Sequence, residues 1–170
     1  SYSDGTPGTT VQYNDYLSRP SSITRNGITI FFSFYDNSPA NHESWTGGTH
    51  DSVAVEHLWD NYFRPSCLVL QCPSGLYGQS YTYDTAGRLY TASDGQNTAT
   101  YTYAANSALV EQINLTHGNT NLTLWRQYDW LNRVTNMANK LGNLTLNSIG
   151  YQYNNANQRT NVTQEDGSFW

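Results

Sequence analysis

The length, composition and charge of this chain exclude several broad classes of protein. Its 170 residues suit one ordinary domain, and a net charge of −5 with scattered basic residues argues against a nucleic-acid partner. No stretch approaches the roughly 18 consecutive apolar residues of a membrane-spanning helix, so we expect no membrane span. Tyr, Thr, Asn and Gly are abundant and only 12% of the residues are charged, which predicts an all-β chain.

A turn signal recurs along the chain at a nearly constant spacing. An Asp or Asn stands four residues before an Arg in five places, and these pairs use five of the seven arginines. In chain order the pairs are Asp15 and Arg19, Asp60 and Arg64, Asp84 and Arg88, Asp129 and Arg133, and Asn155 and Arg159. Two more units keep the frame without the Arg, at Asp36 and Ala104. These seven anchors, 20 to 26 residues apart, predict a single array of about seven β-hairpin repeats over residues 1–170.

A second turn signal, which contains Gly, lies between most of the anchors. Its members are Asp4-Gly5, Asn26-Gly27, Ser74-Gly75, Asp94-Gly95, His117-Gly118, Leu141-Gly142 and Asp166-Gly167. Short turns of this kind connect the strands of hairpins. Each unit therefore reads as strand, turn, strand, turn, and the array is expected to form a continuous antiparallel sheet.

The chemistry of the anchor is clearest at residues 84–88. The Asp84 carboxylate can accept backbone N–H groups of the turn that follows it, and Gly87 can adopt a positive φ. Arg88 then begins the return strand, close enough to pair with Asp84. In other units the position of Gly87 is expected to be taken by Ser18, Asn132 and Gln158.

The residue before the anchor is aromatic in most units. Tyr13 and Tyr153 instead stand one residue further back from Asp15 and Asn155. We therefore expect a bulge or a slightly longer turn in these two units.

Two segments resemble the repeat of the YD-repeat, or Rhs-like, proteins. They are Tyr81-Thr82-Tyr83-Asp84-Thr85-Ala86-Gly87-Arg88-Leu89 and Tyr128-Asp129-Trp130-Leu131-Asn132-Arg133-Val134-Thr135. The resemblance implies a long β-sheet strip, which spirals into a hollow shell in bacterial polymorphic toxins, insecticidal toxin complexes and teneurins. Seven units are too few to close such a shell around cargo. The chain also lacks the Asp-Pro-containing junction that precedes the toxin in Rhs-type carriers, so any toxin would lie outside this segment.

The function expected from these features is structural. The chain would form part of a β-sheet wall, shell or filament that is extracellular or on the cell surface, in a bacterium. One alternative is a segment of a toxin-delivery shell. Another is a module that binds a glycan or protein through exposed aromatics, of which Trp45 and Trp125 are the candidates.

Catalytic and metal-binding patterns are missing from the sequence. There is no Gly-x-Ser-x-Gly elbow and no recognised metal-ligand spacing around the histidines, so we expect no enzyme activity, no cofactor and no metal. A hydrolase site built from Asp51, Glu56 and Asp60 is the weakest of the hypotheses. Cys67 and Cys72 are expected to be free thiols, with an intermolecular disulfide as the alternative.

The two ends of the array are expected to assemble. Tyr2 lies near one end and Phe169 and Trp170 at the other, with little charge around them. Edge strands without charge or cover tend to pair with other strands. We therefore expect the sheet edges to pair with further repeats or with further copies of this chain.

Overall fold

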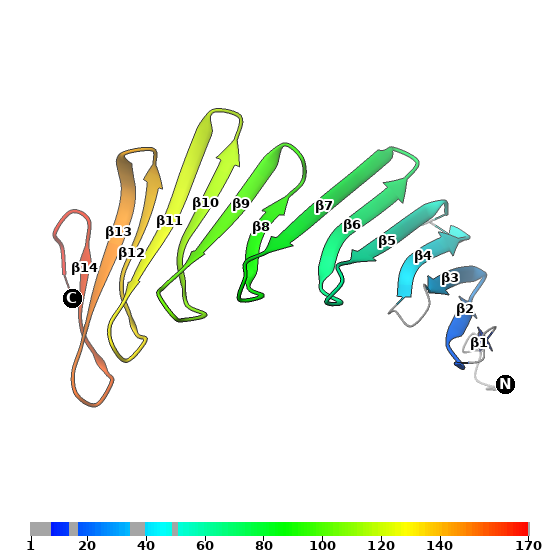
Figure 1. The fold of residues 1–170 in the computed structure, drawn as a ribbon, viewed down its shortest axis with the longest axis horizontal. Helices are drawn as coiled ribbons and strands as arrows, with labels where there is room; N and C mark the ends of the chain where they lie inside the picture. Colours follow the sequence, from blue (N-terminus) through cyan, green and yellow to red (C-terminus); the bar gives the residue numbers. More distant parts are fainter. Residues whose placement is uncertain (1–7, 14–16, 35–39, 49–50, 170) are drawn as a thin grey trace. The chain divides into compact units, whose positions relative to one another are not determined.

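The computed structural model describes residues 8–13, 17–34, 40–48 and 51–169. As predicted, the fold is all-β: these residues form fourteen strands, hydrogen-bonded to one another in chain order, and every pairing between them is antiparallel (Figure 1). No helix in this part of the chain is long and apolar enough to cross a membrane.

The contacts divide the chain into two compact units, Ser1–Ser80 and Tyr81–Trp170. The strands of the first unit are β1 (Thr9–Tyr13), β2 (Pro20–Arg25), β3 (Ile28–Phe34), β4 (Ala40–Thr46), β5 (Val53–Trp59), β6 (Pro65–Cys72) and most of β7 (Gly75–Tyr83). Those of the second unit are β8 (Leu89–Ser93), β9 (Asn97–Tyr103), β10 (Val110–His117), β11 (Thr120–Tyr128), β12 (Val134–Leu141), β13 (Leu144–Tyr153) and β14 (Arg159–Gln164), together with the last residues of β7.

An aromatic residue marks the same irregularity in six of the described hairpins. The strand register shifts by one residue where the outgoing strand ends, at Tyr13, Phe34, Trp59, Tyr103, Tyr128 and Tyr153. An extra residue on the return strand makes each of these a β-bulge, which bends the strand locally. The aromatic residue that ends the first strand of each of these hairpins therefore marks where the repeat begins its anchor turn.

The strand pairing shows how long the turns after Tyr13 and Tyr153 are, where a bulge or a slightly longer turn was expected. Tyr13 pairs with Pro20 across six intervening residues, so the first turn is longer, as predicted. Tyr153 pairs with Arg159 across five, the same number as between Tyr128 and Val134. The unit after Tyr153 therefore has the bulge, which was one of the two predicted alternatives, and not the longer turn.

A left-handed residue precedes the return strand in the anchor turns that fall within the described residues. Gly87 and Asn132 have φ of 78° and 62°, as expected. Ser18 also lies in this region. In the last anchor turn the predicted residue, Gln158, is wrong: Asn157 has the positive φ, of 62°. Asn tolerates this conformation better than Gln, because its short side chain can hydrogen-bond locally.

The opposite row of turns follows the Gly-containing signal closely. Asn26 and Gly27 both have positive φ between the paired residues Arg25 and Ile28, as in a type I′ hairpin turn. Gly118 and Gly142 take φ of 54° and 57° at the first central position of two-residue turns. The predicted turn at Asp4-Gly5 lies outside the described residues.

Neither unit has a conventional core. Among the described residues the buried hydrophobic side chains are Ala138 and Val162, and no large side chain is fully buried. The accessible surface is 11828 Å², whereas a compact domain of this mass would expose about 8,400 Å². Most domains bury apolar surface between two packed layers. Here the strands lack such a second layer, so their order must come from pairing and from the turns.

Phe63 is the residue least suited to its turn. It has φ of 58° and is 62% exposed, in the position that Gly87 and Asn132 hold elsewhere. A left-handed conformation costs a bulky residue about 1 to 2 kcal/mol. We expect Phe63→Asn to raise the free energy of unfolding by about 1 kcal/mol, measured by urea denaturation. The reciprocal Asn132→Phe should lower it, and no change in either variant would contradict this reading.

Candidate functional site

The anchor turn at residues 84–88 is organised by one carboxylate. Oδ1 of Asp84 accepts the backbone N–H groups of Ala86 and Arg88, both at 2.9 Å. Its Oδ2 accepts the Nε–H of Arg88 at 2.7 Å. The Asp84 N–H donates to the Arg88 carbonyl, and the Gly87 N–H donates to the Asp84 carbonyl. Asp84 and Arg88 thus close the turn through both backbone and side chains.

The turns at residues 60–64 and 129–133 repeat this geometry. Oδ1 of Asp60 accepts the N–H groups of Tyr62 and Arg64 at 2.8 and 3.0 Å, and Oδ2 accepts the Arg64 Nε–H at 2.7 Å. Asp129 binds Arg133 in the same way, with an Nε to Oδ2 distance of 2.6 Å. The sequence frame therefore placed these three Asp and Arg pairs correctly.

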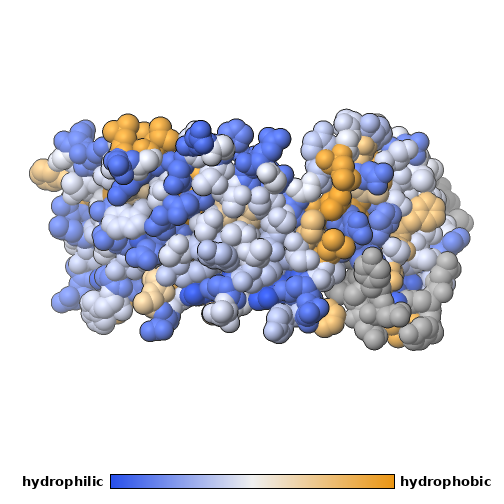
Figure 2. Space-filling model, turned by 45° about the horizontal axis from the view of Figure 1, so that its top comes forward, coloured by the Kyte–Doolittle hydropathy of each residue, from blue (hydrophilic) through white to orange (hydrophobic). Residues whose placement is uncertain are grey.

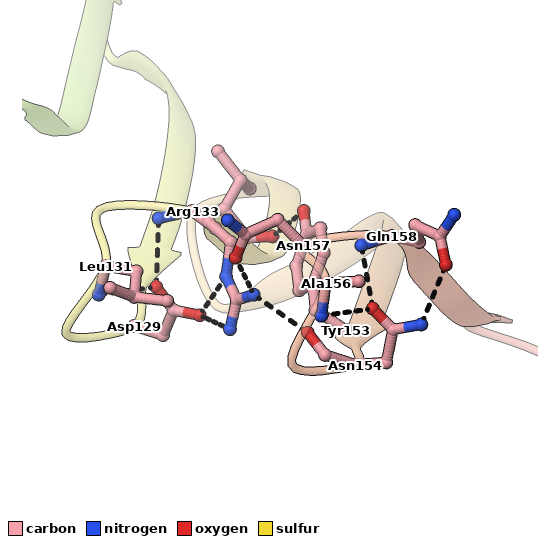
Figure 3. A network of polar contacts seen from close by, with 9 residues as sticks. Asp129, Leu131, Arg133, Tyr153, Asn154, Ala156, Asn157 and Gln158 are labelled. Atoms are coloured by element: carbon pink, nitrogen blue, oxygen red, sulfur yellow. Dashed lines mark hydrogen bonds and ion pairs between the residues drawn. The ribbon is translucent and has the colours of Figure 1, made fainter.

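The last anchor of the array is Asn154 and not the predicted Asn155. Oδ1 of Asn154 accepts the N–H groups of Ala156 and Gln158 at 2.9 and 3.0 Å, and its own N–H donates to the Gln158 carbonyl (Figure 3). Arg159 is not the closing residue of this turn: it begins β14, with its guanidinium 4.2 Å from the centre of the Tyr151 ring. The prediction placed the anchor four residues before Arg159, whereas the anchor is the residue directly after the aromatic Tyr153.

The remaining predicted anchors differ from this pattern or cannot be described. The turn after Tyr103 has Ala104 at its start and is one residue longer, closed by the Ala104 N–H to the Leu109 carbonyl at 2.9 Å. Asp15 and Asp36 lie outside the described residues. Arg19 is described, and its guanidinium lies 4.4 Å from the centre of the Phe34 ring.

The turn environment shifts the acidity of the anchor carboxyls. Partial desolvation works to raise the pKa of Asp84, but the Arg88 backbone amide and guanidinium outweigh it and hold the pKa below its ordinary value. Desolvation is outweighed in the same way at Asp60 by Arg64 and at Asp129 by Arg133, so their pKa values are also lowered. All three carboxylates are ionised at neutral pH.

An arginine joins each of two anchor turns to the next turn along the chain. The Arg133 guanidinium lies 4.5 Å from the centre of the Tyr153 ring, and its Nη1 donates to Oδ1 of Asn157 at 2.7 Å (Figure 3). Arg88 lies 4.2 Å from the centre of the Tyr103 ring, and its Nη1 donates to the Ser107 carbonyl. Each arginine therefore binds its own turn through Asp and the following turn through its outer nitrogen.

Tyrosine hydroxyls make the return connection. Tyr103, Tyr128 and Tyr153 each donate from the hydroxyl to a backbone carbonyl of the preceding repeat, at 2.7 Å in every case; the acceptors are Leu89, Val110 and Val134. Each acceptor is the first residue of a return strand. We call the combined arginine and tyrosine contacts between successive turns the inter-repeat bracket. These contacts between repeats were not predicted from the sequence, although the Tyr that stands directly before an anchor residue indicates them.

The two candidate binding aromatics are both half-buried. Trp45 lies in β4 directly opposite Ile30 and Val53, so its ring belongs to an apolar cross-strand row. Trp125 has the Lys140 ammonium 5.2 Å from its ring centre. More exposed aromatics lie on the anchor turns, with Trp130 at 86% and Tyr62 at 78% exposure.

Among the described residues there is no group of three or more His, Cys, Asp or Glu side chains that could hold a metal. His42 and Glu56 face each other across β4 and β5. Cys67 and Cys72 are free cysteines. A hydrogen bond with the Ser74 hydroxyl is the main influence on Cys72 and lowers the pKa of its thiol.

The predicted assembly edges are only partly described. Tyr2 and Trp170 lie outside the described residues. Phe169 is 74% exposed and makes an isolated antiparallel bridge with Thr163 of β14. At the other end of the strand order, every residue of β1 is exposed.

Comparison with known proteins gives similarity of fold alone. No family model and no curated protein matches the chain. A crystal structure of TcdB2-TccC3-Cdc42 is similar with a TM-score of 0.40 and 10% identity, over 92% of this chain and 11% of that one. The crystal structure of TcdB2-TccC3 without its hypervariable C-terminal region is similar with a TM-score of 0.40 and 9% identity, over 92% of this chain and 11% of that one. A porin-like protein from Bacteroides uniformis ATCC 8492 is similar with a TM-score of 0.40 and 13% identity, over 99% of this chain and 88% of that one. Similarity at this level establishes neither a family nor a function.

Removing one bracket hydroxyl should destabilise the second unit. Tyr153→Phe keeps the ring beside Arg133 but loses the hydrogen bond to the Val134 carbonyl. We expect the free energy of unfolding to fall by about 1 kcal/mol, measured by urea denaturation. Tyr90→Phe, at a tyrosine that is 49% exposed, is the matched control and should have little effect. An equal loss in both variants would contradict a specific role for the hydroxyl.

The anchor carboxylates should make stability depend on acid. Because their pKa values are lowered on folding, the unfolded chain binds more protons, so stability present at neutral pH is lost as the pH falls below about 4. In a double variant, Asp84→Asn with Asp129→Asn, the amide oxygens can still accept the backbone N–H groups, as Asn154 does. We expect thermal denaturation to show lower stability at neutral pH and a shallower decline in acid. A decline as steep as that of the parent chain would contradict the assignment.

Proposed function

We propose that this chain is a structural repeat module that forms part of an extracellular or cell-surface β-sheet wall. The observation that carries the proposal is the inter-repeat bracket. Arg88 with Tyr103 joins the turn at residues 84–88 to the turn at residues 104–109, and Arg133 with Tyr153 joins the turn at residues 129–133 to the turn at residues 154–158. These side chains are used for contacts between repeats, which is the work of a scaffold.

The second support is the absence of a covering layer in the described part of the chain. A repeat array whose units contact only their neighbours can be lengthened without redesigning a core. The turn bonds of Asp84, Asp129 and Asn154 are local and would be the same in a longer array. This architecture suits a wall that grows by adding hairpins.

The resemblance to YD-repeat proteins gives the proposal its finer form. The segment around Tyr83, Asp84 and Arg88 carries the motif, and the fold agrees with a strip of hairpins. Within this proposal the chain is bacterial, has no catalytic role, and serves as one part of a longer shell or filament. If that shell delivers a toxin, the toxin lies outside the 170 residues.

We further propose that the wall extends through strand pairing at its edges. β1 is exposed along its whole length, and Val11 at its centre is 39% exposed. An uncovered and uncharged edge strand is a template for another strand. The partner would be a further repeat or a further copy of the chain.

Light scattering after size-exclusion chromatography tests this edge pairing. The isolated chain should form species that grow with concentration, and Val11→Lys should reduce that growth because it places a charge on the edge. The control is Leu70→Lys, at a residue of similar exposure, 37%, in β6, which has a neighbour on each side. A parent chain that never exceeds two copies at any concentration would contradict extension through the edges.

A further inference from the structure

One tyrosine of the inter-repeat bracket has no arginine over its ring. In the brackets before and after it, the guanidiniums of Arg88 and Arg133 lie 4.2 and 4.5 Å from the centre of the following tyrosine ring. Tyr128 stands at the equivalent position, with its hydroxyl bonded to the preceding return strand. Within the described residues, no guanidinium or ammonium lies over the Tyr128 ring. The cause is Leu109, which closes the preceding turn where Arg88 and Arg133 close theirs.

The turn at residues 104–109 is closed without a carboxylate. Ala104 begins it, where Asp84 begins the equivalent turn of the preceding unit, and the Ala104 N–H donates to the Leu109 carbonyl. The Leu109 N–H donates to the Ser107 hydroxyl at 3.0 Å, which takes the part that the Asp84 carboxylate has in its own turn. This turn therefore lacks both the carboxylate and the guanidinium that other units place beside the tyrosine.

A cavity of about 370 Å³ lies beside Tyr128. Its lining residues are Ala104, Glu111, Gln127, Tyr128 and Thr135. They come from the ends of β9 and β11 and from the starts of β10 and β12, whose turns are neighbours along the lower edge of this unit (Figure 1). Pockets for small ligands take about 300 to 1,000 Å³, so the cavity has room for one side chain of a partner. We call it the Tyr128 cavity.

Glu111 gives the Tyr128 cavity a negative charge without a partner. It is the extra residue of a β-bulge, and its carboxylate makes no hydrogen bond or ion pair with any described residue. Arg126, on the neighbouring strand β11, forms no ion pair with it in this part of the chain. Gln127 and Thr135 add an amide oxygen and a hydroxyl as further acceptors. Several acceptors beside an aromatic ring suit a guanidinium, which carries five N–H donors and stacks on rings.

We propose that the Tyr128 cavity binds the arginine side chain of a partner protein. The ligand class follows from the neighbouring units, in which a guanidinium lies over the equivalent tyrosine and donates to a carboxylate. Here Tyr128 supplies the ring and Glu111 the carboxylate. The net charge of −5 favours the approach of a basic partner. The site lies on the turns of the array and does not depend on strand pairing at its edges.

Charge and hydrogen bonding separate an arginine from other ligands. An apolar ligand would remove water from Glu111 without giving it a partner, which costs free energy. A lysine ammonium would pair with Glu111, but it has no planar group to stack on Tyr128 and no fork of donors. Hydrophilic side chains also predominate on the side of the second unit that Figure 2 presents, with apolar ones gathered mainly at the upper left. An apolar partner would therefore find few contacts on that side.

NMR titration of the isotope-labelled whole chain with short peptides tests the proposal. We expect a Gly-Arg-Gly peptide with blocked ends to shift the amide signals of Glu111, Gln127 and Tyr128 and to reach saturation. The same peptide with citrulline, the neutral isostere of arginine, should bind about tenfold more weakly because it offers no charge to Glu111. A lysine peptide should also bind more weakly. The absence of a saturable shift, or equal affinity for either control peptide, would overturn the proposal.

Variants of the chain test whether binding occurs in this cavity. Glu111→Gln should weaken binding of the arginine peptide about tenfold. The matched control is Glu165→Gln, at an exposed carboxylate that lines another cavity of the same unit, and it should leave binding unchanged. Ala104→Asp with Leu109→Arg should place the chain's own pair in the cavity, abolish peptide binding and raise the urea midpoint of unfolding. Binding that survives either change, or an equal loss in the control, would overturn the proposal.

Discussion

The hydrogen bond from a tyrosine hydroxyl to the carbonyl of the preceding return strand is the interaction on which the second unit most depends. It recurs at Tyr103, Tyr128 and Tyr153 with one length, 2.7 Å. A sheet with no covering layer buries little apolar surface, so polar contacts carry more of its order than in a compact domain. The hydroxyl also ties each of these aromatics to the preceding return strand, and at Tyr103 and Tyr153 it acts beside an arginine that joins the same two turns.

The arginines complete this arrangement because a guanidinium can donate in several directions at once. Nε of Arg133 binds the Asp129 carboxylate, while Nη1 reaches the following turn. A lysine has one compact ammonium and could not serve both turns in this way. This geometry requires arginine at positions 88 and 133. In the turn at residues 154–158, the Asn154 side-chain amide donates to the Gln158 side chain, so that turn is closed locally.

Much of the repeat could be predicted from sequence because its turns are local. The Asp and Arg at residues 84–88 and 129–133 lie four apart, and Gly87 and Asn132 suit their positive φ. The anchor at Asn154 was missed because an arginine at the wrong register outweighed the aromatic before it. Phe63 could not be foreseen in a left-handed conformation, since its side chain disfavours it.

Features that join distant parts of the sequence were beyond such reasoning. The bracket spans 19 residues between Tyr153 and Val134, and its partners become neighbours only once strand register and bulges are fixed. Trp125 was expected to be available for binding, but Lys140 reaches its ring from the next strand. The alignment of Leu115, Leu122, Leu141 and Leu144 across β10 to β13 likewise depends on the pairing of four strands. Register decides which side chains meet, and a period-two pattern alone does not fix it.

A double-mutant cycle between Arg133 and Tyr153 tests the central claim most directly. Arg133→Gln introduces the residue found at position 158, and Tyr153→Phe removes the hydroxyl; Tyr153→Ala in a second cycle removes the ring. If the bracket holds successive repeats together, unfolding measurements should give a coupling energy of about 0.5 to 1 kcal/mol for Arg133 with the Tyr153 ring. The same cycle between Arg88 and Tyr153, which belong to different brackets, should give a value within about 0.3 kcal/mol of zero. A coupling near zero for Arg133 and Tyr153 would contradict the account.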